Sequence, residues 1–392
     1  MKVLLVLEEL FETDGKNIAS NSNWYIMALE LLKHFTKGVL WVPIRKTSKI
    51  NFANVINVQK IDNIEIVGRF PYSSFKKYYL GLIINFFSLH YSTNKLVKEA
   101  DIIIIRGPTQ LSKILLFYAK IYNKKIISII AGDFEKTAYE NIRNVFFERC
   151  IAKLVIPYIE ANQRKLIKNS KVVFVYGDEL FKKYNKLNKN MFVTQSALLS
   201  IEDFFFRSDT CLNDTIRLIR IGNYHKNKNY ELIINVVNKL KSKGIKIELH
   251  CFGQILDVVY FNFLKSISSS EVFLNSQIKF GTKLFEEYKK SDIQIITSFS
   301  EGVPRTIIEG ASFGVPLIAV NVGGIDSIVK NRVNGILLEK HSVELLSDAI
   351  INLINNKTLR QKIIRNGYIL SKSKTRCVVI NDIVKKIKCN YE

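Results

Sequence analysis

Short runs of branched apolar residues alternate along the chain with longer segments whose apolar residues recur at helical spacing. The runs in the first half are KVLLVL (2–7), DIIIIRG (101–107), KKIISIIAG (124–132) and SKVVFVYG (170–177), and a helical segment lies near 22–35. Continuous runs of this kind are typical of parallel strands that are covered on both faces. Helical segments between such strands predict βαβ units and therefore an α/β sheet.

The pattern pauses over residues 196–214 and then begins again. The later runs are 215–222, 245–253, 292–298, 315–321 and 335–339. Between the first two of them, the apolar residues Ile233, Val236, Val237 and Leu240 fall on one helix face. The sequence therefore predicts two Rossmann-like, doubly wound domains that face each other across a cleft. Their expected bounds are 1–195 and 215–370, with a linker at 196–214 and a C-terminal helix within 371–392 that packs back toward the first domain.

Composition and charge narrow the class of partner. Hydrophobic residues make up 47% of the chain and charged residues 24%, as in folded soluble proteins. The net charge of +23 indicates either an anionic partner, such as a nucleotide or a phospholipid surface, or a compositional bias toward lysine. The lysines are spread along the chain and no RNA-binding signature occurs, so no nucleic acid is expected. Five scattered cysteines and a strand-like N-terminus indicate a cytoplasmic protein without zinc or disulfides.

One apolar segment leaves two interpretations open. Residues 78–91, YYLGLIINFFSLHY, are too few to cross a bilayer and are flanked by Lys76, Lys77 and Lys95. The first interpretation is a helix buried in the first domain. The second is an interfacial helix whose basic flanks meet an anionic membrane surface.

The densest chemistry lies in SFSEGVPRTIIEGASFGVP, residues 298–316, where two carboxylates stand eight positions apart. Gly302-Val303-Pro304 ends a strand-to-helix loop, and Pro304 suits the first helical position. The free N–H groups and the positive dipole end of that helix would form an anion site. Glu309, about two turns into the helix, could bind ribose hydroxyls, and Glu301 could bind a sugar. The alternative is that Glu301 caps the helix and Glu309 is exposed.

Two further loops follow strands of the same predicted sheet. In NVGGID (321–326), the paired glycines either allow close approach of a ligand or form an ordinary tight turn. In IGNYHKNKN (221–229), Lys226 and Lys228 either neutralise a diphosphate or belong to a solvated basic loop. Ligands of open α/β sheets bind beyond the carboxyl ends of the strands, where all three loops are expected.

The region 298–339 resembles the donor-binding half of glycosyltransferase family 4, the retaining GT-B enzymes also called glycosyl transferases group 1. Glu301 and Glu309 match the E-x7-E motif of that family. The segment FGTKLFEEYKKSDIQIITS before it and the placing of IGNYHKNKN are similar too. The resemblance is specific over roughly 215–370 and only architectural over 1–200.

The resemblance implies roles for individual residues. Glu309 would bind the nucleotide ribose, Glu301 the transferred sugar, and Lys228 the diphosphate. Asn223 stands where the family often has arginine, so Lys226 is a candidate replacement. The remaining candidates are backbone donors around Gly302, Val303 and Pro304, and the first-domain cleft contacts Gly15 and Arg106.

The resemblance also implies a reaction. A sugar would move with retained anomeric configuration from a nucleotide-diphosphate sugar, UDP before GDP, to a hydroxyl of a glycan or lipid-linked acceptor. Capsule or lipopolysaccharide assembly on the inner membrane face is the expected setting. No Asp-x-Asp occurs, so neither a metal nor a cofactor is expected.

Other functions stay open. The same fold serves nucleotide-sugar epimerases, phosphorylases and inactive nucleotide-sugar-binding relatives. Epimerases need histidines in the cleft, and His225 is the one histidine near the loops described above. Neither G-x-G-x-x-G nor G-x-x-x-x-G-K-[ST] occurs, so the sequence predicts neither a dinucleotide-binding dehydrogenase nor a P-loop nucleotide-binding protein.

Overall fold

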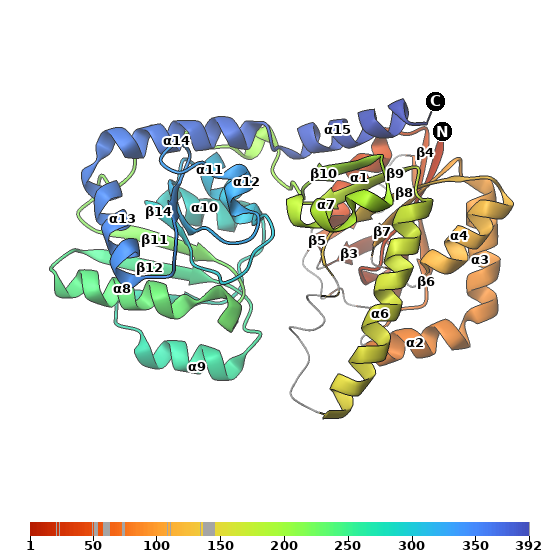
Figure 1. Cartoon of the computed structure of the whole chain (residues 1–392), viewed down its shortest axis with the longest axis horizontal. Coiled ribbons are helices and arrows are strands. Elements are labelled where there is room, and N and C mark those ends of the chain that lie inside the picture. The colour runs from red at the N-terminus through yellow and green to blue at the C-terminus, as the bar shows by residue number, and fades with distance from the viewer. Residues whose placement is uncertain are drawn as a thin grey trace. The chain divides into compact units, whose positions relative to one another are not determined.

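The computed structural model describes the chain except for a small set of residues, and it divides into two compact units. The residues that it does not describe are 21, 23, 49, 51–53, 58–62, 73–74, 108, 110, 134, 136–145 and 392. The first unit comprises Met1–Leu198 together with Cys377–Glu392, and the second comprises Leu199–Arg376. Each unit is an α/β structure with its own sheet (Figure 1).

The sheet of the first unit follows the order β10-β9-β8-β7-β1-β4-β2-β3-β5, and β6 pairs with β4 beside this path. Pairing is parallel throughout except for β2 with β3 and β3 with β5. The strands are β1 (Lys2–Val6), β2 (Phe11–Thr13), β3 (Asn17–Ser20), β4 (Lys37–Lys46), β5 (Asn54–Asn57), β6 (Ile64–Arg69), β7 (Ile102–Gly107), β8 (Lys125–Ile130), β9 (Val172–Tyr176) and β10 (Met191–Thr194). The four strands predicted for this half are therefore confirmed as β1, β7, β8 and β9.

Helices cover the sheet of the first unit. They are α1 (Trp24–Lys33), α2 (Phe75–Ile84), α3 (Phe86–Glu99), α4 (Ser112–Ile121), α6 (Phe146–Asn169), α7 (Asp178–Tyr184) and α15 (Arg376–Cys389). One core cluster joins Leu4 and Val6 of β1 with Val97 of α3 and Leu115 of α4. These strands are apolar on both faces, as the uninterrupted runs predicted.

The single helix expected at 78–91 is two helices. α2 and α3 meet at Asn85, and Figure 1 shows them running at an angle to each other. The Asn85 backbone is non-helical, with φ −97° and ψ 18°, and its side-chain amide donates to the carbonyl oxygen of Gly81 at 2.9 Å. An asparagine side chain that competes for a backbone carbonyl disfavours a straight helix at this point.

The second unit has a six-stranded, fully parallel sheet in the order β13-β12-β11-β14-β15-β16. The strands are β11 (Ile216–Ile221), β12 (Ile247–Phe252), β13 (Val272–Asn275), β14 (Ile293–Ile296), β15 (Leu317–Val320) and β16 (Ile336–Leu338). The helices are α8 (Tyr230–Ser242), α9 (Val258–Ile267), α10 (Thr282–Lys290), α11 (Arg305–Ser312), α12 (Ile325–Ile328), α13 (Val343–Asn355) and α14 (Lys357–Lys372). The chain order reverses between β11 and β14, which is the switch point where such sheets bind ligands.

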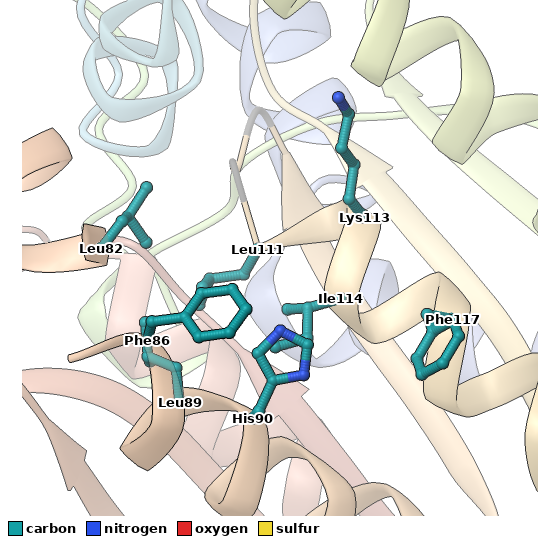
Figure 2. A pocket seen from close by; sticks show the side chains of 8 residues that line it. All are labelled: Leu82, Phe86, Leu89, His90, Leu111, Lys113, Ile114 and Phe117. Atoms are coloured by element: carbon teal, nitrogen blue, oxygen red, sulfur yellow. The ribbon is translucent and has the colours of Figure 1, made fainter. Parts of the chain in front are cut away.

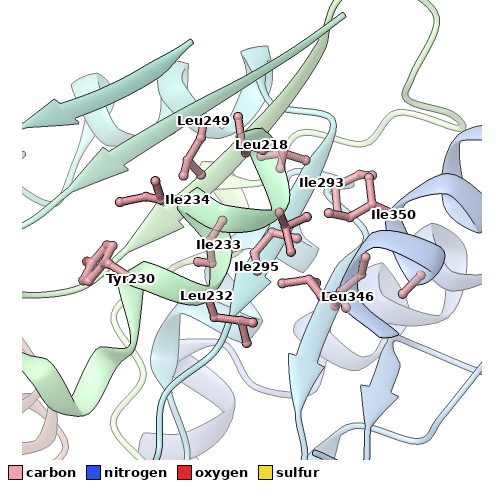
Figure 3. Close-up of a cluster of buried hydrophobic side chains, with 14 of the residues drawn as sticks. Leu218, Tyr230, Leu232, Ile233, Ile234, Leu249, Ile293, Ile295, Leu346 and Ile350 are labelled. Carbon is pink, nitrogen blue, oxygen red and sulfur yellow. The ribbon is translucent and has the colours of Figure 1, made fainter. Parts of the chain in front are cut away.

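Helices lie on both faces of this sheet. Leu218 of β11 belongs to the core cluster that contains α8 and α13, whereas its neighbour Ile219 packs with Tyr288 of α10. Successive strand residues point to opposite faces, so the two clusters lie on opposite sides of β11. Figure 3 shows the first cluster, where Ile233 of α8 and Ile350 of α13 approach the strands. The helix face predicted from Ile233 onward is fully buried.

Residues 199–214, at the start of the second unit, and the chain after α14, at its end, differ in where they pack. Residues 199–214, expected as part of a linker, are integrated into this unit: Leu199 is buried beside Phe313, and Arg360 forms a 2.6 Å ion pair with Asp209. Arg207 donates hydrogen bonds to backbone carbonyls at the end of α10. After α14 the chain returns to the first unit, which contains α15.

Among the described residues, no helix has both the length and the apolar character needed to cross a membrane.

Candidate active site

Three loops of the second unit leave the same edge of the sheet. They follow β11, β14 and β15, which are neighbours in the sheet, so the predicted convergence of the loops is observed. Backbone and side-chain hydrogen bonds tie the loops together. The N–H of Phe299 donates to the carbonyl of Asn227 at 2.8 Å, and the Asn227 side chain donates to the carbonyl of Ser300 at 3.1 Å. The N–H of Gly324 donates to the carbonyl of Gly302 at 3.1 Å.

Glu301 is the centre of this arrangement. Its Oε1 accepts from Lys228 Nζ at 2.6 Å and from Ser298 Oγ at 2.6 Å. Nη2 of Arg220 lies 4.0 Å from the same oxygen. The structure therefore brings together Glu301 and Lys228, the two residues predicted to be catalytic. Glu301 does not cap α11, so the alternative assignment of Glu301 as a helix cap is wrong.

Arg220 is a member of the site that sequence reasoning missed. It is only 1% exposed, and its Nη2 donates to Ser298 Oγ at 2.8 Å. Its guanidinium carbon also lies 5.6 Å from the centre of the Tyr230 ring. A charged residue is almost never fully buried unless it is paired. The signal was present in IRLIRI, because Arg220 follows Leu218 by two positions and therefore shares its buried face.

The loop geometry fixes the backbone of Lys228. This residue ends a short 3-10 helix, Lys226–Lys228, and the following Asn229 is left-handed with φ 47°. Thr297 Oγ1 donates to the carbonyls of Lys228 and Asn229 at 3.2 and 2.9 Å. These two hydrogen bonds hold the backbone of Lys228 close to the end of β14, and from there its ammonium reaches Glu301.

The other two residues predicted on this loop lie elsewhere. Asn223 and Lys226 are exposed, and the described contacts of Glu301 come from Lys228, Ser298 and Arg220. His225 caps the 3-10 helix, because its Nδ1 accepts from the N–H of Asn227 at 3.2 Å. A bound diphosphate could still reach Lys226, so its donor-binding role stays a prediction.

Helix α11 begins one residue later than expected. Pro304 is the N-cap residue, with φ −64° and ψ 122°, and the helix starts at Arg305. Pro304 supplies no side-chain cap, so the first N–H groups of α11 are not satisfied by it. Gly302 is exposed and a Cβ at its position would meet nothing within 4 Å, which leaves open space at the start of the helix. Binding of an anion at this helix start stays a prediction.

Glu309 lies in the second turn of α11, nearer the helix start than predicted, and it is buried. Its exposed fraction is 6%, so the alternative in which Glu309 is merely exposed is wrong. Tyr288 OH donates to Glu309 Oε2 at 3.3 Å. Burial raises the pKa of the Glu309 carboxyl, while the charge of Arg305 and the hydrogen bond from Tyr288 oppose that shift. A carboxylate buried at this position has lost water and gains from new hydroxyl donors.

The paired glycines after β15 have a structural cause. Gly323 has φ +59°, and a Cβ there would lie 1.7 Å from the carbonyl oxygen of Glu301. A Cβ on Gly324 would lie 3.0 Å from the carbonyl oxygen of Gly302. The N–H of Ile325 donates to the carbonyl of Val322 at 3.4 Å, so the glycines form the tight turn that was one of the two alternatives, and they also allow the close approach of two site loops. Close approach of a ligand stays a prediction.

His341, which follows β16, also contacts the site and was not predicted. Its Nε2 lies 3.1 Å from the carbonyl oxygen of Ser298, and its ring centre lies 4.6 Å from that of Phe299. His341 stands 43 positions from Ser298, so no local pattern could have linked the two.

The candidates in the first unit have different surroundings. Gly15, with φ +94°, lies in the hairpin turn between β2 and β3, and a Cβ there would meet nothing within 4 Å. Arg106, at the end of β7, forms an ion pair with Glu9, and its guanidinium carbon lies 4.8 Å from the centre of the Trp24 ring. Beside this pair, Arg69 Nη2 lies 2.5 Å from Glu8 Oε2. A contact of Gly15 or Arg106 with substrate stays a prediction.

Within the described part of the chain, no three or more His, Cys, Asp or Glu side chains gather in a way that could hold a metal ion. The cations next to Glu301 are the side chains of Lys228 and Arg220. Metal-free handling of a diphosphate stays a prediction.

Comparison with known proteins agrees with the motifs. Residues 203–369 match the family model described as "Glycosyl transferases group 1". The match includes all three site loops and confirms the resemblance to the group 1 glycosyl transferases; it is consistent with family 4.

Two curated relatives show how far the similarity extends. Protein CapJ of Staphylococcus aureus is 27% identical over 271 residues, which are 68% of this chain and 66% of CapJ. A UDP-Gal:alpha-D-GlcNAc-diphosphoundecaprenol alpha-1,3-galactosyltransferase of Escherichia coli is 32% identical over 107 residues, which are 25% of this chain and 27% of that enzyme. The matched parts therefore span less than two thirds of the length of these relatives.

The fold has a counterpart among solved structures. The crystal structure of Anabaena HepE in complex with UDP has a TM-score of 0.72 to this chain, covering 99% of this chain and 100% of HepE at 13% identity. At that identity the likeness shows the fold alone. It confirms the predicted class, a GT-B protein with two Rossmann-like α/β units.

Proposed function

Because residues 203–369 match the group 1 glycosyltransferases and the fold is GT-B, we propose that the chain transfers a sugar from a nucleotide-diphosphate sugar to an acceptor hydroxyl, with retention of the anomeric configuration. The observation that carries the proposal is the convergence of Lys228, Ser298 and Arg220 on Glu301 at the switch point of the sheet. Two cations and a carboxylate at this place suit a donor that has both phosphate and sugar groups.

Each group of the donor has a complementary partner in the site. The diphosphate binds at the N-terminus of α11, where backbone N–H groups and the helix dipole favour an anion, and beside the Lys228 ammonium. Glu309 accepts hydrogen bonds from the ribose hydroxyls, and Glu301 accepts them from the transferred sugar. As the glycosidic bond breaks, negative charge develops on the departing diphosphate, and Lys228 stabilises that charge.

Arg220 acts as a positioning residue in this proposal. It is buried in β11 and bonded to Ser298, so it stays in place while Lys228 turns from Glu301 to the diphosphate. Its guanidinium, 4.0 Å from Glu301 Oε1, then remains beside that carboxylate while the sugar binds. Arg220 thus supplies from the strand a fixed cation that Asn223, in the loop after it, cannot supply.

The comparisons support a UDP donor and a lipid-linked or glycan acceptor. HepE binds UDP in its crystal structure, and the name of the E. coli relative specifies UDP-galactose and a diphosphoundecaprenol-linked sugar. We therefore place the chain in the assembly of a cell-surface polysaccharide. Hexose transfer and independence of metal ions and cofactors belong to the same proposal.

The decisive experiment is a thermal-shift panel with UDP, GDP, ADP and their common sugar conjugates, with and without EDTA. A ligand that binds the native state raises the melting temperature by mass action. We expect a shift with UDP compounds that EDTA does not alter, followed by transfer whose product keeps the donor anomeric configuration by NMR. No shift with any nucleotide, or an inverted product, would overturn the proposal.

Activity assays with the same nucleotide sugars separate the alternatives. A 2-epimerase would interconvert the free nucleotide sugar without an acceptor. A phosphorylase would depend on inorganic phosphate. An inactive relative would shift with donor and show no donor hydrolysis.

A further inference from the structure

The helix pair α2 and α3 exposes its apolar face to solvent. Leu80 and Ile84 lie one turn apart on α2, and Phe87 and Tyr91 lie one turn apart on α3; their exposed fractions are 56%, 71%, 85% and 72%. Ile83 beside them is 73% exposed. Leu80 and Ile84 therefore share one face of α2, and Phe87 and Tyr91 share one face of α3, and such apolar faces of a surface helix are normally buried. The sequence interpretation in which this segment is a buried helix is therefore wrong for these residues.

The exposed face continues onto α4 through a chain of ring contacts. The rings of Phe87 and Phe86 lie 5.5 Å apart, and those of Phe86 and His90 lie 4.4 Å apart. The ring centres of His90 and Tyr118 lie 5.8 Å apart, and those of Tyr118 and Phe117 lie 5.1 Å apart. Phe117 and, one turn later, Ile121 are more than half exposed. We call this continuous surface the α2–α4 face; it consists of Leu80, Ile83, Ile84, Phe86, Phe87, Tyr91, Phe117 and Ile121.

A cavity of about 320 Å³ opens within the α2–α4 face. Figure 2 shows Phe86 and His90 of α3 on one side of it and Ile114 and Phe117 of α4 on the other. Lys113, at its border, is exposed and donates to Tyr158 OH at 2.8 Å. The lining is mostly apolar, so the cavity suits a hydrocarbon chain better than a sugar.

Charge indicates which kind of partner the face meets. The three helices α2, α3 and α4 contain six lysines, at positions 76, 77, 95, 98, 113 and 120, and one acidic residue, Glu99. The carboxylate of Glu99 is bound by Lys2 at 2.5 Å. Helices that combine exposed apolar and aromatic side chains with an excess of lysine over acidic residues are complementary to an anionic lipid surface. The apolar groups enter the boundary of the acyl chains, and the ammonium groups contact lipid phosphates.

We propose that the α2–α4 face docks the first unit on the surface of an anionic phospholipid bilayer, with Ile84 and Phe87 inserted at the headgroup boundary and one acyl chain entering the cavity. Contiguous apolar patches of this kind mark interaction surfaces in proteins. The proposal goes beyond sugar transfer, because it depends on none of the residues around Glu301. It fixes which face of the first unit turns toward the membrane.

The test is flotation of the whole chain with vesicles of phosphatidylcholine alone or with added phosphatidylglycerol. We expect binding to the phosphatidylglycerol vesicles that weakens as salt is raised, because screening reduces the lysine contribution. The variant Ile84→Ser with Phe87→Ser should lose at least tenfold in vesicle affinity, and Lys120→Glu should lose affinity for the anionic vesicles alone. Val259→Ser is the matched control, because Val259 is 80% exposed on α9 of the second unit.

The outcomes separate this proposal from its competitors. The three target side chains are exposed, so their variants should keep the wild-type melting temperature and its shift with nucleotide. Absence of vesicle binding, or binding that Ile84→Ser with Phe87→Ser leaves unchanged, would overturn the proposal. A dimer in solution that the same variant dissociates, without vesicle binding, would show instead that a second copy covers the face. Vesicle binding by a chain that binds no nucleotide would refute the proposed enzyme and leave the membrane surface standing.

Discussion

Lys228 Nζ lies 2.6 Å from Glu301 Oε1, although the two residues stand 73 positions apart in the chain. The contact joins the loop after β11 to the loop after β14, two adjacent strands of the parallel sheet. It places an ammonium and a carboxylate in contact at the switch point of the sheet. The residues around this pair lead to the following predictions.

Replacement of Lys228 by alanine should lower turnover. Removing a charge that stabilises a developing anion costs about 100- to 1,000-fold in kcat in comparable sites. Lys243→Ala is the control for loss of a lysine, because Lys243 is exposed at the end of α8 and has no proposed role in the site. Steady-state kinetics with the donor identified by thermal shift measures both. Equal losses in the two variants would contradict the assignment of Lys228.

Replacement of Glu309 by alanine should weaken nucleotide binding. Loss of two charge-assisted hydrogen bonds to ribose hydroxyls corresponds to roughly 2–4 kcal/mol, or 30- to 900-fold in Kd. Isothermal titration with UDP measures the change. Glu286→Gln, on the exposed surface of α10, is the control for loss of a carboxylate in the same unit. Affinity within twofold of wild type for Glu309→Ala would remove Glu309 from the binding site.

The pH dependence of the protein should report Glu309. Burial raises the pKa of this carboxyl in the folded state above its usual value of about 4.3. The folded chain therefore holds this proton to higher pH than the unfolded chain, so the contribution of Glu309 to the free energy of unfolding is present below the unfolded pKa and declines as pH rises through the folded pKa. Nucleotide affinity should change in the opposite sense and rise with pH over the same window, because ribose hydroxyls bind the ionised form. Glu309→Gln should flatten both profiles, and a wild-type slope retained in that variant would contradict the prediction.

Ser298→Ala should impair turnover more than nucleotide binding. Ser298 Oγ donates to Glu301 Oε1 and accepts from Arg220 Nη2, so its removal frees the sugar-binding carboxylate and leaves the buried guanidinium without that acceptor. A hydrogen bond to a charged group contributes about 1.5–3 kcal/mol. We expect kcat to fall at least tenfold while the Kd for UDP stays within threefold. Ser298→Thr, which keeps the hydroxyl, should restore part of kcat. If Ser298 had only a structural role, Ser298→Ala would lower the melting temperature without changing the ratio of kcat to Kd.

Gly323→Ala should disturb the site through the backbone. The left-handed φ of +59° and the 1.7 Å approach of a Cβ to the Glu301 carbonyl both oppose any side chain. We expect a loss of at least 1–2 kcal/mol in the free energy of unfolding, together with weaker donor binding, because the Glu301 loop must move. Gly132→Ala, at a position where a Cβ meets nothing within 4 Å, is the control. Urea denaturation measures the stability of both variants, and equal midpoints would contradict the argument.

The sequence determined the elements whose signal is local. Runs such as VVFV and IIII are apolar on consecutive positions, which parallel strands covered on both faces require, and the helix face of Ile233 to Leu240 has the period of an α-helix. The two carboxylates at 301 and 309 and the turn between them were visible for the same reason. The strands β2 and β4 were not predicted, because β2 has one apolar residue and the apolar run of β4 contains Pro43, a residue that is rare inside sheets.

Only the tertiary structure showed which residues far apart in the chain contact each other. Arg220 is part of the site because β11 lies beside β14. In the loop after β14, Ser298 accepts a hydrogen bond from Arg220, and Glu301 lies 4.0 Å from its guanidinium. The glycines at 323 and 324 were explained only when the Glu301 loop was found against them. For the apolar segment 78–91 the sequence left a buried helix and an interfacial helix open, because an apolar segment does not reveal whether the fold covers it; Leu80, Ile84, Phe87 and Tyr91 are exposed.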